Sequence, residues 1–258
     1  MRWPSLWFSG FTGIALTFVG ADAAAAAAGI CSARSGSQIM PLIELYTSEG
    51  CSSCPPADHW LSREIRSGEP RANWLAFHVD YWDELGWPDR FASPRHSERQ
   101  RRRVNAAGQS AVYTPQVMIG RQVQTTWRAA PAFARALDAA QGTAEVGLAL
   151  QLQPQGTGWT LHLGAARGDK APAKASIWLA QTLDAQETRV HAGENNGITL
   201  RHDRVVTKLW GPWPLGSAPV SRMVSVEPGE GAWGLTAFVE GADGSVLQSL
   251  RLAQTDCR

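Results

Sequence analysis

The chain has 258 residues, of which 44% are apolar and 18% are charged, and its formal net charge is +1. A chain of this length can bury a core without extra covalent support, in one large domain or two ordinary ones. A net charge this close to zero excludes a global field that would attract nucleic acid or an anionic membrane, so we expect no nucleic-acid partner.

The N-terminal segment has the pattern of a secretory signal peptide. Arg2 provides a positive start, an apolar run follows over residues 6–20, and Ala21-Asp22-Ala23 matches a small-x-small cleavage site. We expect a signal peptide over residues 1–28, cut at about residues 23–28, and therefore a periplasmic or secreted protein without stable membrane insertion after cleavage. The run is short and Gly-rich for a membrane span, so an uncleaved anchor is the weaker alternative, with lipidation at Cys31 weaker still.

The first half of the chain, residues 38–142, alternates between strand and helix patterns. Pro115 interrupts one apolar strand, and a proline in that position marks an edge, a bulge or a cis peptide bond. The order β-α-β-α-β-β-α predicts an α/β layer architecture. The predicted strands are 41–46, 74–79, 112–119 and 123–126, and the predicted helices are 55–67, 93–107 and 131–140.

The second half, residues 143–258, changes to short alternating strands separated by turn residues. Such spacing predicts a β-sandwich. The clearest strands are 146–152, 159–163, 176–182 and 234–240. We therefore predict a domain boundary near residue 143.

Four cysteines are present, an even number that suits an oxidising compartment. Cys31 lies close to the predicted mature N-terminus, and Cys257 lies close to the C-terminus. Because chain termini often lie near each other on a domain surface, we expect a structural Cys31–Cys257 disulfide. Two unrelated thiols are the alternative.

The other two cysteines, Cys51 and Cys54, form a C-x-x-C directly between a predicted strand and a predicted helix. Cys51 then lies at a helix N-terminus, where free N–H groups and the helix dipole favour the attacking thiolate, and Cys54 can resolve a mixed disulfide. A purely structural disulfide is one alternative. A metal site is another, with His59, His78 and Asp80 as the available extra ligands, although the second C-x-x-C of a zinc ribbon is missing. No dissociable cofactor is expected, because the dithiol itself carries the electrons.

Other polar residues surround these cysteines in sequence. Asp58 follows Cys54 by one helical turn, so it either accepts the Cys54 proton or is a surface acid favourable with the helix dipole. We interpret His78 as a core histidine. Asp80 and Trp82 follow a strand at its carboxyl end, where α/β sheets bind ligands, so we expect them to line a substrate groove.

The basic run from Arg95 to Arg103 lies on a predicted helix and is interpreted as a solvated face. Binding of nucleic acid would need a wider basic surface. A Gly/Asn-rich stretch, residues 191–203, either covers the dithiol or forms a long hairpin.

Longer motifs in the chain resemble the DUF1223 family, which implies secreted bacterial proteins of uncharacterised function within the thioredoxin-like superfamily. The resemblance implies that Thr114-Pro115 is the counterpart of a cis-proline facing the dithiol, with the Thr114 backbone turned towards an extended substrate. The chain departs from the family pattern at Ile119-Gly120-Arg121, where the family implies a tighter Asp-Gly turn. This departure affects only the hairpin expected there. The motifs that carry the resemblance are residues 44–58, 78–83, 86–94, 113–117 and 191–203.

The predicted fold class is therefore α/β, a thioredoxin-like domain (38–142) followed by a C-terminal β-sandwich domain (143–258). The predicted function is exported thiol–disulfide exchange on exported proteins or small thiols, with Cys51 as nucleophile, Cys54 as resolving thiol and Asp58 as candidate proton acceptor. The alternatives are a non-catalytic thioredoxin-like binding module with a structural disulfide and a Cys/His metal-handling protein. The sequence fixes neither the direction of exchange nor the oligomeric state.

Overall fold

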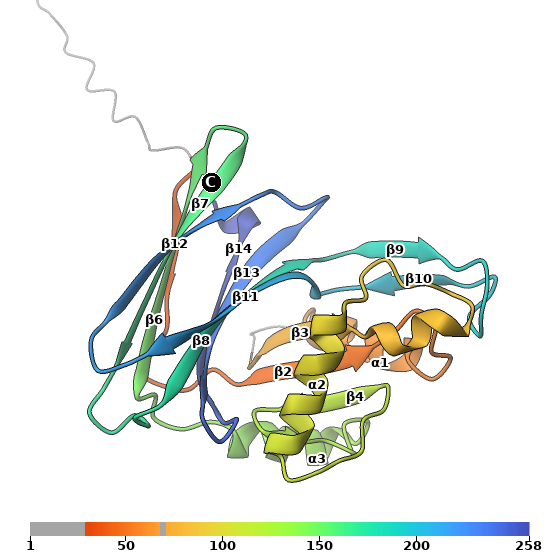
Figure 1. Ribbon diagram of the computed structural model, residues 1–258, viewed down its shortest axis with the longest axis horizontal. Helices are drawn as coiled ribbons and strands as arrows, with labels where there is room; N and C mark the ends of the chain where they lie inside the picture. The colour runs from red at the N-terminus through yellow and green to blue at the C-terminus, as the bar shows by residue number, and fades with distance from the viewer. Residues whose placement is uncertain (1–28, 68–70, 258) are drawn as a thin grey trace, which may run out of the picture.

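A computed structural model describes residues 29–67 and 71–257 (Figure 1). The signal peptide predicted over residues 1–28 lies outside the described residues. Within the part of the chain that is described, none of the helices has the length and apolar character needed to cross a membrane.

β-Strand is the commonest secondary structure of the described chain, arranged around one large mixed sheet with the order β14-β13-β8-β11-β3-β2-β4-β5. A second sheet has the order β1-β6-β7-β12, and β9 and β10 pair as a hairpin. The strands are β1 (Cys31–Arg34), β2 (Leu42–Thr47), β3 (Asn73–His78), β4 (Gln116–Ile119), β5 (Gln122–Val123), β6 (Val146–Gln155), β7 (Gly158–Arg167), β8 (Ala175–Leu183), β9 (Gln186–Arg189), β10 (Thr199–His202), β11 (Val205–Leu215), β12 (Val220–Val226), β13 (Trp233–Gly241) and β14 (Val246–Ala253). The helices are α1 (Pro55–Glu64), α2 (Pro94–Ala106) and α3 (Ala130–Ala139), with short 3₁₀ helices η1 (Asp80–Leu85) and η2 (Gln254–Asp256).

The predicted fold class, an α/β thioredoxin-like domain followed by a β-sandwich domain, is wrong. Strands from both halves of the chain belong to the same eight-stranded sheet, because β11 lies parallel to β3 and pairs with it at Val205 and Ala76. The sequence pattern predicted β3, but it did not predict which strand pairs with the edge of β3 opposite to β2. An unpaired strand edge leaves N–H and C=O groups without partners, and β11 satisfies part of that edge here. The boundary near residue 143 stays a prediction.

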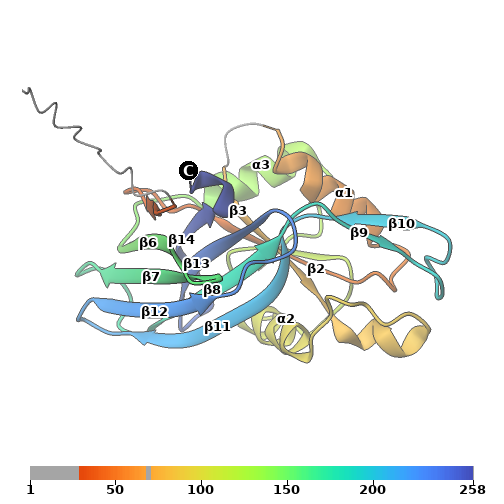
Figure 2. The same ribbon diagram turned by 90° about the horizontal axis from the view of Figure 1, so that it is seen from above.

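Each half of the large sheet is covered differently. The second sheet packs face to face on β14-β13-β8-β11, and their shared core contains Leu150, Leu161, Leu179 and Leu235. On the other half, α1 and α3 lie on one face and α2 on the opposite face (Figure 2). The covered half holds the candidate site, at the end of β2.

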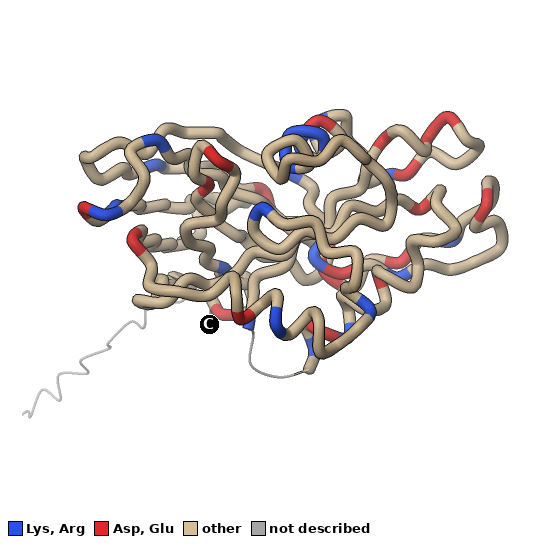
Figure 3. Tube along the Cα trace, turned by 90° about the horizontal axis from the view of Figure 1, so that it is seen from below, with Lys and Arg blue, Asp and Glu red and all other residues tan. Residues whose placement is uncertain are grey.

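Lys and Arg positions are interspersed with Asp and Glu positions over the fold (Figure 3). The arginines of α2 are not all solvated, contrary to the prediction from the basic run. Arg99 and Arg103 are buried. Both contact the buried carboxylate of Glu44 in β2, with an Nε–Oε distance of 3.1 Å in each case, and Arg99 also contacts Glu240 in β13. Burial alone would raise the pKa of Glu44, but Arg99 and Arg103 outweigh it and lower that pKa to about 2. The ion cluster therefore ties together two strands from different halves of the sheet.

The two ends of the described chain are joined covalently. Cys31 at the start of β1 and Cys257 after η2 form a disulfide with their Cα atoms 4.6 Å apart, the pairing expected from the sequence. This bridge connects the second sheet to the end of the large sheet.

Candidate functional site

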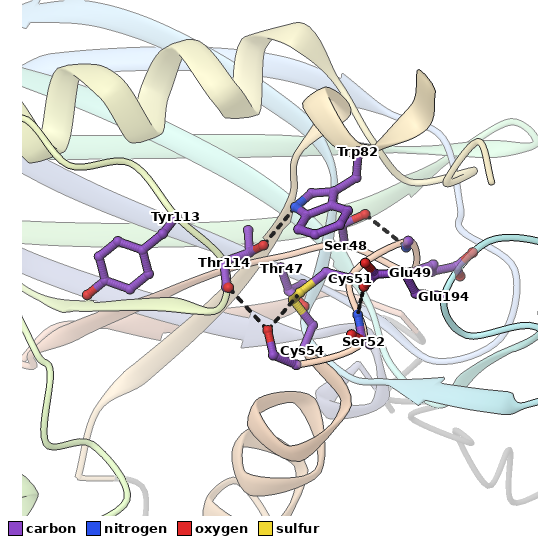
Figure 4. Close-up of a disulfide and its surroundings, with 12 residues drawn as sticks. Thr47, Ser48, Glu49, Cys51, Ser52, Cys54, Trp82, Tyr113, Thr114 and Glu194 are labelled. Atoms are coloured by element: carbon purple, nitrogen blue, oxygen red, sulfur yellow. Dashed lines mark hydrogen bonds between the residues drawn. A yellow bond between two sulfur atoms is a disulfide. The ribbon is translucent and has the colours of Figure 1, made fainter. Parts of the chain in front are cut away.

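The C-x-x-C segment connects β2 to α1 and is closed by a Cys51–Cys54 disulfide, with Cα atoms 5.4 Å apart (Figure 4). Pro55 and Pro56 occupy the first turn of α1, where the missing proline N–H groups cost nothing. The next two N–H groups, of Ala57 and Asp58, donate to the Cys54 carbonyl oxygen at 2.8 and 3.2 Å. The disulfide therefore lies at the N-terminus of α1, as the sequence predicts for the two cysteines.

The cysteines share their surroundings with Thr114 and Trp82. The Ser53 hydroxyl lies 3.3 Å from Cys51 Sγ and donates to the Thr114 carbonyl oxygen at 3.4 Å. Trp82 Nε1 donates to Thr114 Oγ1 at 2.8 Å, and the Thr114-Pro115 peptide bond is cis (Figure 4). The structure thus brings Thr114, Pro115 and Trp82 to the disulfide.

Asp80 has a different environment. Its carboxylate accepts a hydrogen bond from Ser97 Oγ in α2, and the same hydroxyl accepts from the Asp80 N–H at 3.2 Å. These contacts join η1 to α2. Asp80 therefore faces α2, whereas Trp82 faces the dithiol.

The loop between β9 and β10, in the second half of the chain, covers the disulfide. Both cysteine residues are fully buried. Asn195 Nδ2 donates to the carbonyl oxygens of Glu49 at 2.8 Å and of Cys51 at 3.1 Å, while the Glu194 carboxylate accepts from the Ser52 N–H at 2.9 Å. The stretch 191–203 therefore contains the loop and second strand of the β9–β10 hairpin, and its loop also covers the dithiol.

Asp58 is buried against His202, a histidine that no local sequence motif marks as part of the site. His202 Nδ1 lies 3.8 Å from Asp58 Oδ2, and His202 Nε2 lies 3.5 Å from Glu49 Oε1. Burial alone lowers the pKa of His202, but the Asp58 and Glu49 carboxylates outweigh it and raise that pKa to about 10. Asp58 also accepts from Thr47 Oγ1 at 3.2 Å. Within residues 29–67 and 71–257, no hydrogen bond joins its carboxylate to Cys54.

A second buried pair adjoins this one. His78 Nδ1 lies 2.6 Å from Asp89 Oδ2, and the same oxygen accepts from the Glu49 N–H at 2.9 Å. Burial would raise the pKa of Asp89, but the charge and hydrogen bond of His78 outweigh it and lower that pKa to about 2. The imidazole rings of His78 and His202 meet edge to face, 4.8 Å between centroids. Three carboxylates therefore lie near the C-x-x-C segment and contact these two imidazoles: those of Glu49, Asp58 and Asp89.

The cluster contains histidine and carboxylate side chains, which are residue types that bind metal ions. Nowhere in the described ranges are three or more His, Cys, Asp or Glu side chains grouped so that they could hold a metal ion. His78 instead uses its Nδ1 to contact Asp89.

Replacing Asn195 by Ala is expected to speed the reduction of Cys51–Cys54 by dithiothreitol about fivefold to thirtyfold, because two hydrogen bonds that hold the loop closed are lost. The rate is measured by stopping the reaction at set times with a thiol-trapping reagent and counting the trapped thiols by mass spectrometry. Asn196→Ala, at the exposed neighbouring position, is the matched control and should leave the rate unchanged. Equal rates for both variants and the unchanged protein would contradict a covering role.

The fold and the site define a mostly β protein with a mixed sheet and a covered C-x-x-C disulfide. The chain belongs to the DUF1223 family, described as a protein of unknown function, which matches over residues 42–239. Among solved structures, the chain is similar to the crystal structure of AGR_C_4864 from Agrobacterium tumefaciens, at 25% identity and a TM-score of 0.62, covering 84% of this chain and 96% of that one. It is also similar in fold to HBP35 of Porphyromonas gingivalis, at 12% identity and a TM-score of 0.62, covering 84% of this chain and 76% of that one. No curated protein matches the chain in sequence.

Proposed function

We propose that the protein is exported and carries out thiol–disulfide exchange through Cys51 and Cys54, on exported proteins or small thiols. The observation that supports this most is the disulfide between two cysteines three positions apart at the start of α1, beside Ser53 and the Thr114 carbonyl group. A helix N-terminus offers N–H groups and a positive dipole end to a thiolate that forms there.

The proposed exchange balances as a two-electron transfer. A substrate thiolate attacks Cys51 Sγ, the Cys51–Cys54 bond breaks, and Cys54 leaves as a thiolate that takes up a proton. A second substrate thiolate then attacks the substrate sulfur of the mixed disulfide, releasing oxidised substrate and the reduced dithiol. The reverse sequence reduces a substrate disulfide, with Cys51 as the nucleophile and Cys54 as the resolving thiol.

The neighbouring residues have matching roles in this proposal. Thr114 and Trp82 contact the extended substrate next to Cys51, and the loop that carries Asn195 moves aside to admit it. When the dithiol reduces a substrate, Asp58, four residues after Cys54 on α1, accepts the Cys54 proton, while the protonated His202, 3.8 Å from this carboxylate, holds it in place.

An equilibrium redox titration of Cys51–Cys54 in glutathione and dithiothreitol buffers, followed by thiol trapping and mass spectrometry, tests the proposal. A reversible midpoint between about −120 and −270 mV is the expected result. Cys51→Ser should abolish exchange with a model disulfide, while the same protein keeps its Cys31–Cys257 bridge as an internal reference.

The complete burial of both cysteines favours a second candidate, a non-catalytic binding module in which the disulfide is structural. A pair that stays oxidised below about −300 mV behaves as a structural disulfide. That result would overturn the exchange proposal in favour of the binding module.

A further inference from the structure

A cavity of about 1020 Å³ lies on the face of the large sheet that carries α1 and α3. It is bounded by these two helices, β14 and the segment that follows β1. Its wall is aromatic, formed by Trp60, Trp74, Trp127 and Phe133. Trp60 is central to this group, with ring centroids 5.2 Å from Trp74 and 4.9 Å from Trp127 and from Phe133. The volume is at the upper end of the range for small-molecule sites, which are mostly apolar with a few polar groups that fix orientation.

The rim of the same cavity is strongly basic. Six arginines line it, against two acidic residues, Glu64 and Asp256. The arginines are Arg34, Arg63, Arg71, Arg128, Arg204 and Arg251. A cavity lined by this excess of guanidinium groups favours an anion over a neutral or cationic ligand.

Only part of this positive charge is neutralised by the protein itself. Arg71 pairs with Asp138, while Arg204 and Arg251 share the single carboxylate of Asp184. Burial, followed by the charge of Arg204, lowers the pKa of Arg251 to about 10. Arg34, Arg63 and Arg128 form no ion pair with any carboxylate of residues 29–67 and 71–257, so that part of the chain does not neutralise their guanidinium groups.

The position of Arg128 links the basic rim to the aromatic wall. Its guanidinium carbon lies 4.7 Å from the centre of the Trp127 ring. A flat ring that stacks on this wall would therefore carry its acidic group close to a cation. Arginine serves such sites well, because its planar fork can bind a carboxylate or sulfonate while its face packs on an aromatic ring.

We propose that this cavity is a binding site for a small amphiphilic anion, an aromatic body with one carboxylate or sulfonate group. The aromatic wall takes the ring system, and Arg63 and Arg128 take the acidic group. None of the four cysteines lines the cavity, so the proposal stands apart from the exchange reaction. A second cavity of about 550 Å³ shares Trp60, Arg63, Trp127 and Arg128, and it extends the site along α1 to Pro55.

Two fluorescent probes that differ only in the charged group provide the test. 8-Anilinonaphthalene-1-sulfonate carries the sulfonate, and N-phenyl-1-naphthylamine has the same ring system without it. We expect saturable binding of the sulfonate to the full protein at one site, with energy transfer from tryptophan, and weaker binding of the neutral probe. Equal affinity for the two probes would overturn the anionic part of the proposal, and no saturable binding of either would overturn the site.

Matched variants locate the binding. Arg63→Gln combined with Arg128→Gln should weaken the sulfonate about tenfold, as expected for two partly exposed charge contacts, and leave the neutral probe within about twofold. The control is Arg101→Gln combined with Arg222→Gln, two exposed arginines outside the cavity. An equal loss in the control would mean general attraction of anions to the surface and would overturn the proposal.

A third variant fills the space. Ala134 lines the cavity from α3, and Ala134→Phe should weaken both probes together. Circular dichroism and the thermal unfolding midpoint verify that the variant is folded. Unchanged binding of both probes by folded Ala134→Phe would overturn the location. The redox titration of Cys51–Cys54 is independent of all these results, so failure of one proposal is distinguishable from failure of the other.

Discussion

Arg99→Met is expected to lower the free energy of unfolding by about 3–5 kcal/mol, because it leaves buried carboxylates without their main cation. Arg99 contacts both Glu44 and Glu240, and all three side chains are at most 4% exposed. Urea unfolding followed by tryptophan fluorescence measures the loss.

Arg102→Met is the control for this prediction. Arg102 is a neighbour on α2 that contacts Glu240 at 3.4 Å, but its side chain is 47% exposed. We expect a loss below about 1 kcal/mol, as for other exposed ion pairs. Equal losses in the two variants would show that burial of the cluster does not control stability.

The effect of Arg99→Met should also depend on pH. The pKa of Glu44 is about 2 in the folded protein, against an ordinary value of 4.5. A lowered carboxyl pKa stabilises the folded state above pH 4.5, and this contribution is lost as the pH falls through about 2. The stability difference between Arg99→Met and the unchanged protein should therefore shrink as the solution is acidified. A difference that stays constant down to pH 2 would mean that the carboxylates are not involved.

Loss of the Cys31–Cys257 bridge is the second large effect. The combined variant Cys31→Ser and Cys257→Ser is expected to lose about 2–5 kcal/mol of unfolding free energy, because a long closed loop restricts the unfolded chain. The separation of the two residues is 226, which places the chain-entropy limit at about 5 kcal/mol.

The combined variant avoids the free thiol that a single replacement would leave. Denaturant unfolding of the oxidised protein and of the variant, at the same pH, gives the difference. A loss below about 1 kcal/mol would show that the unfolded chain is already compact enough for the bridge to restrict it little.

Local sequence patterns were sufficient for most of the helices and strands. Pro55 and Pro94 mark the first turns of α1 and α2, and strict alternation marks β6 and β7. These signals depend on residues close in sequence, so they survive whatever the tertiary arrangement is.

The joining of the two halves had no such signal. β11 contains Pro212 and Pro214, which argue against a strand, and its pairing with β8 is irregular between Trp210 and Trp213. The fold class was mispredicted because the link between β11 and β3 is a long-range pairing. Similarly, a basic helix predicts a solvated face, and only the positions of Glu44 and Glu240 in three dimensions explain why Arg99 is buried.

The candidate site was predicted in part. Cys51, Cys54, Thr114 and Trp82 are gathered at one place, whereas Asp80 is directed to α2. Asn195 and His202 were missed as individual residues, although both lie in the Gly/Asn-rich stretch. Their role depends on the hairpin folding back over the dithiol, which no local pattern specifies.

Under the proposed export, the Cys31–Cys257 bridge can close only after nearly the whole chain has entered the oxidising compartment, because 226 positions separate its two cysteines. Cys51 and Cys54 follow Cys31 closely in the chain, so they are the first possible partners for Cys31 when the N-terminus enters first. Pairing of Cys51 with Cys54 leaves Cys31 available for Cys257. The order in which the two disulfides form therefore decides whether the long ring closes with its native partner.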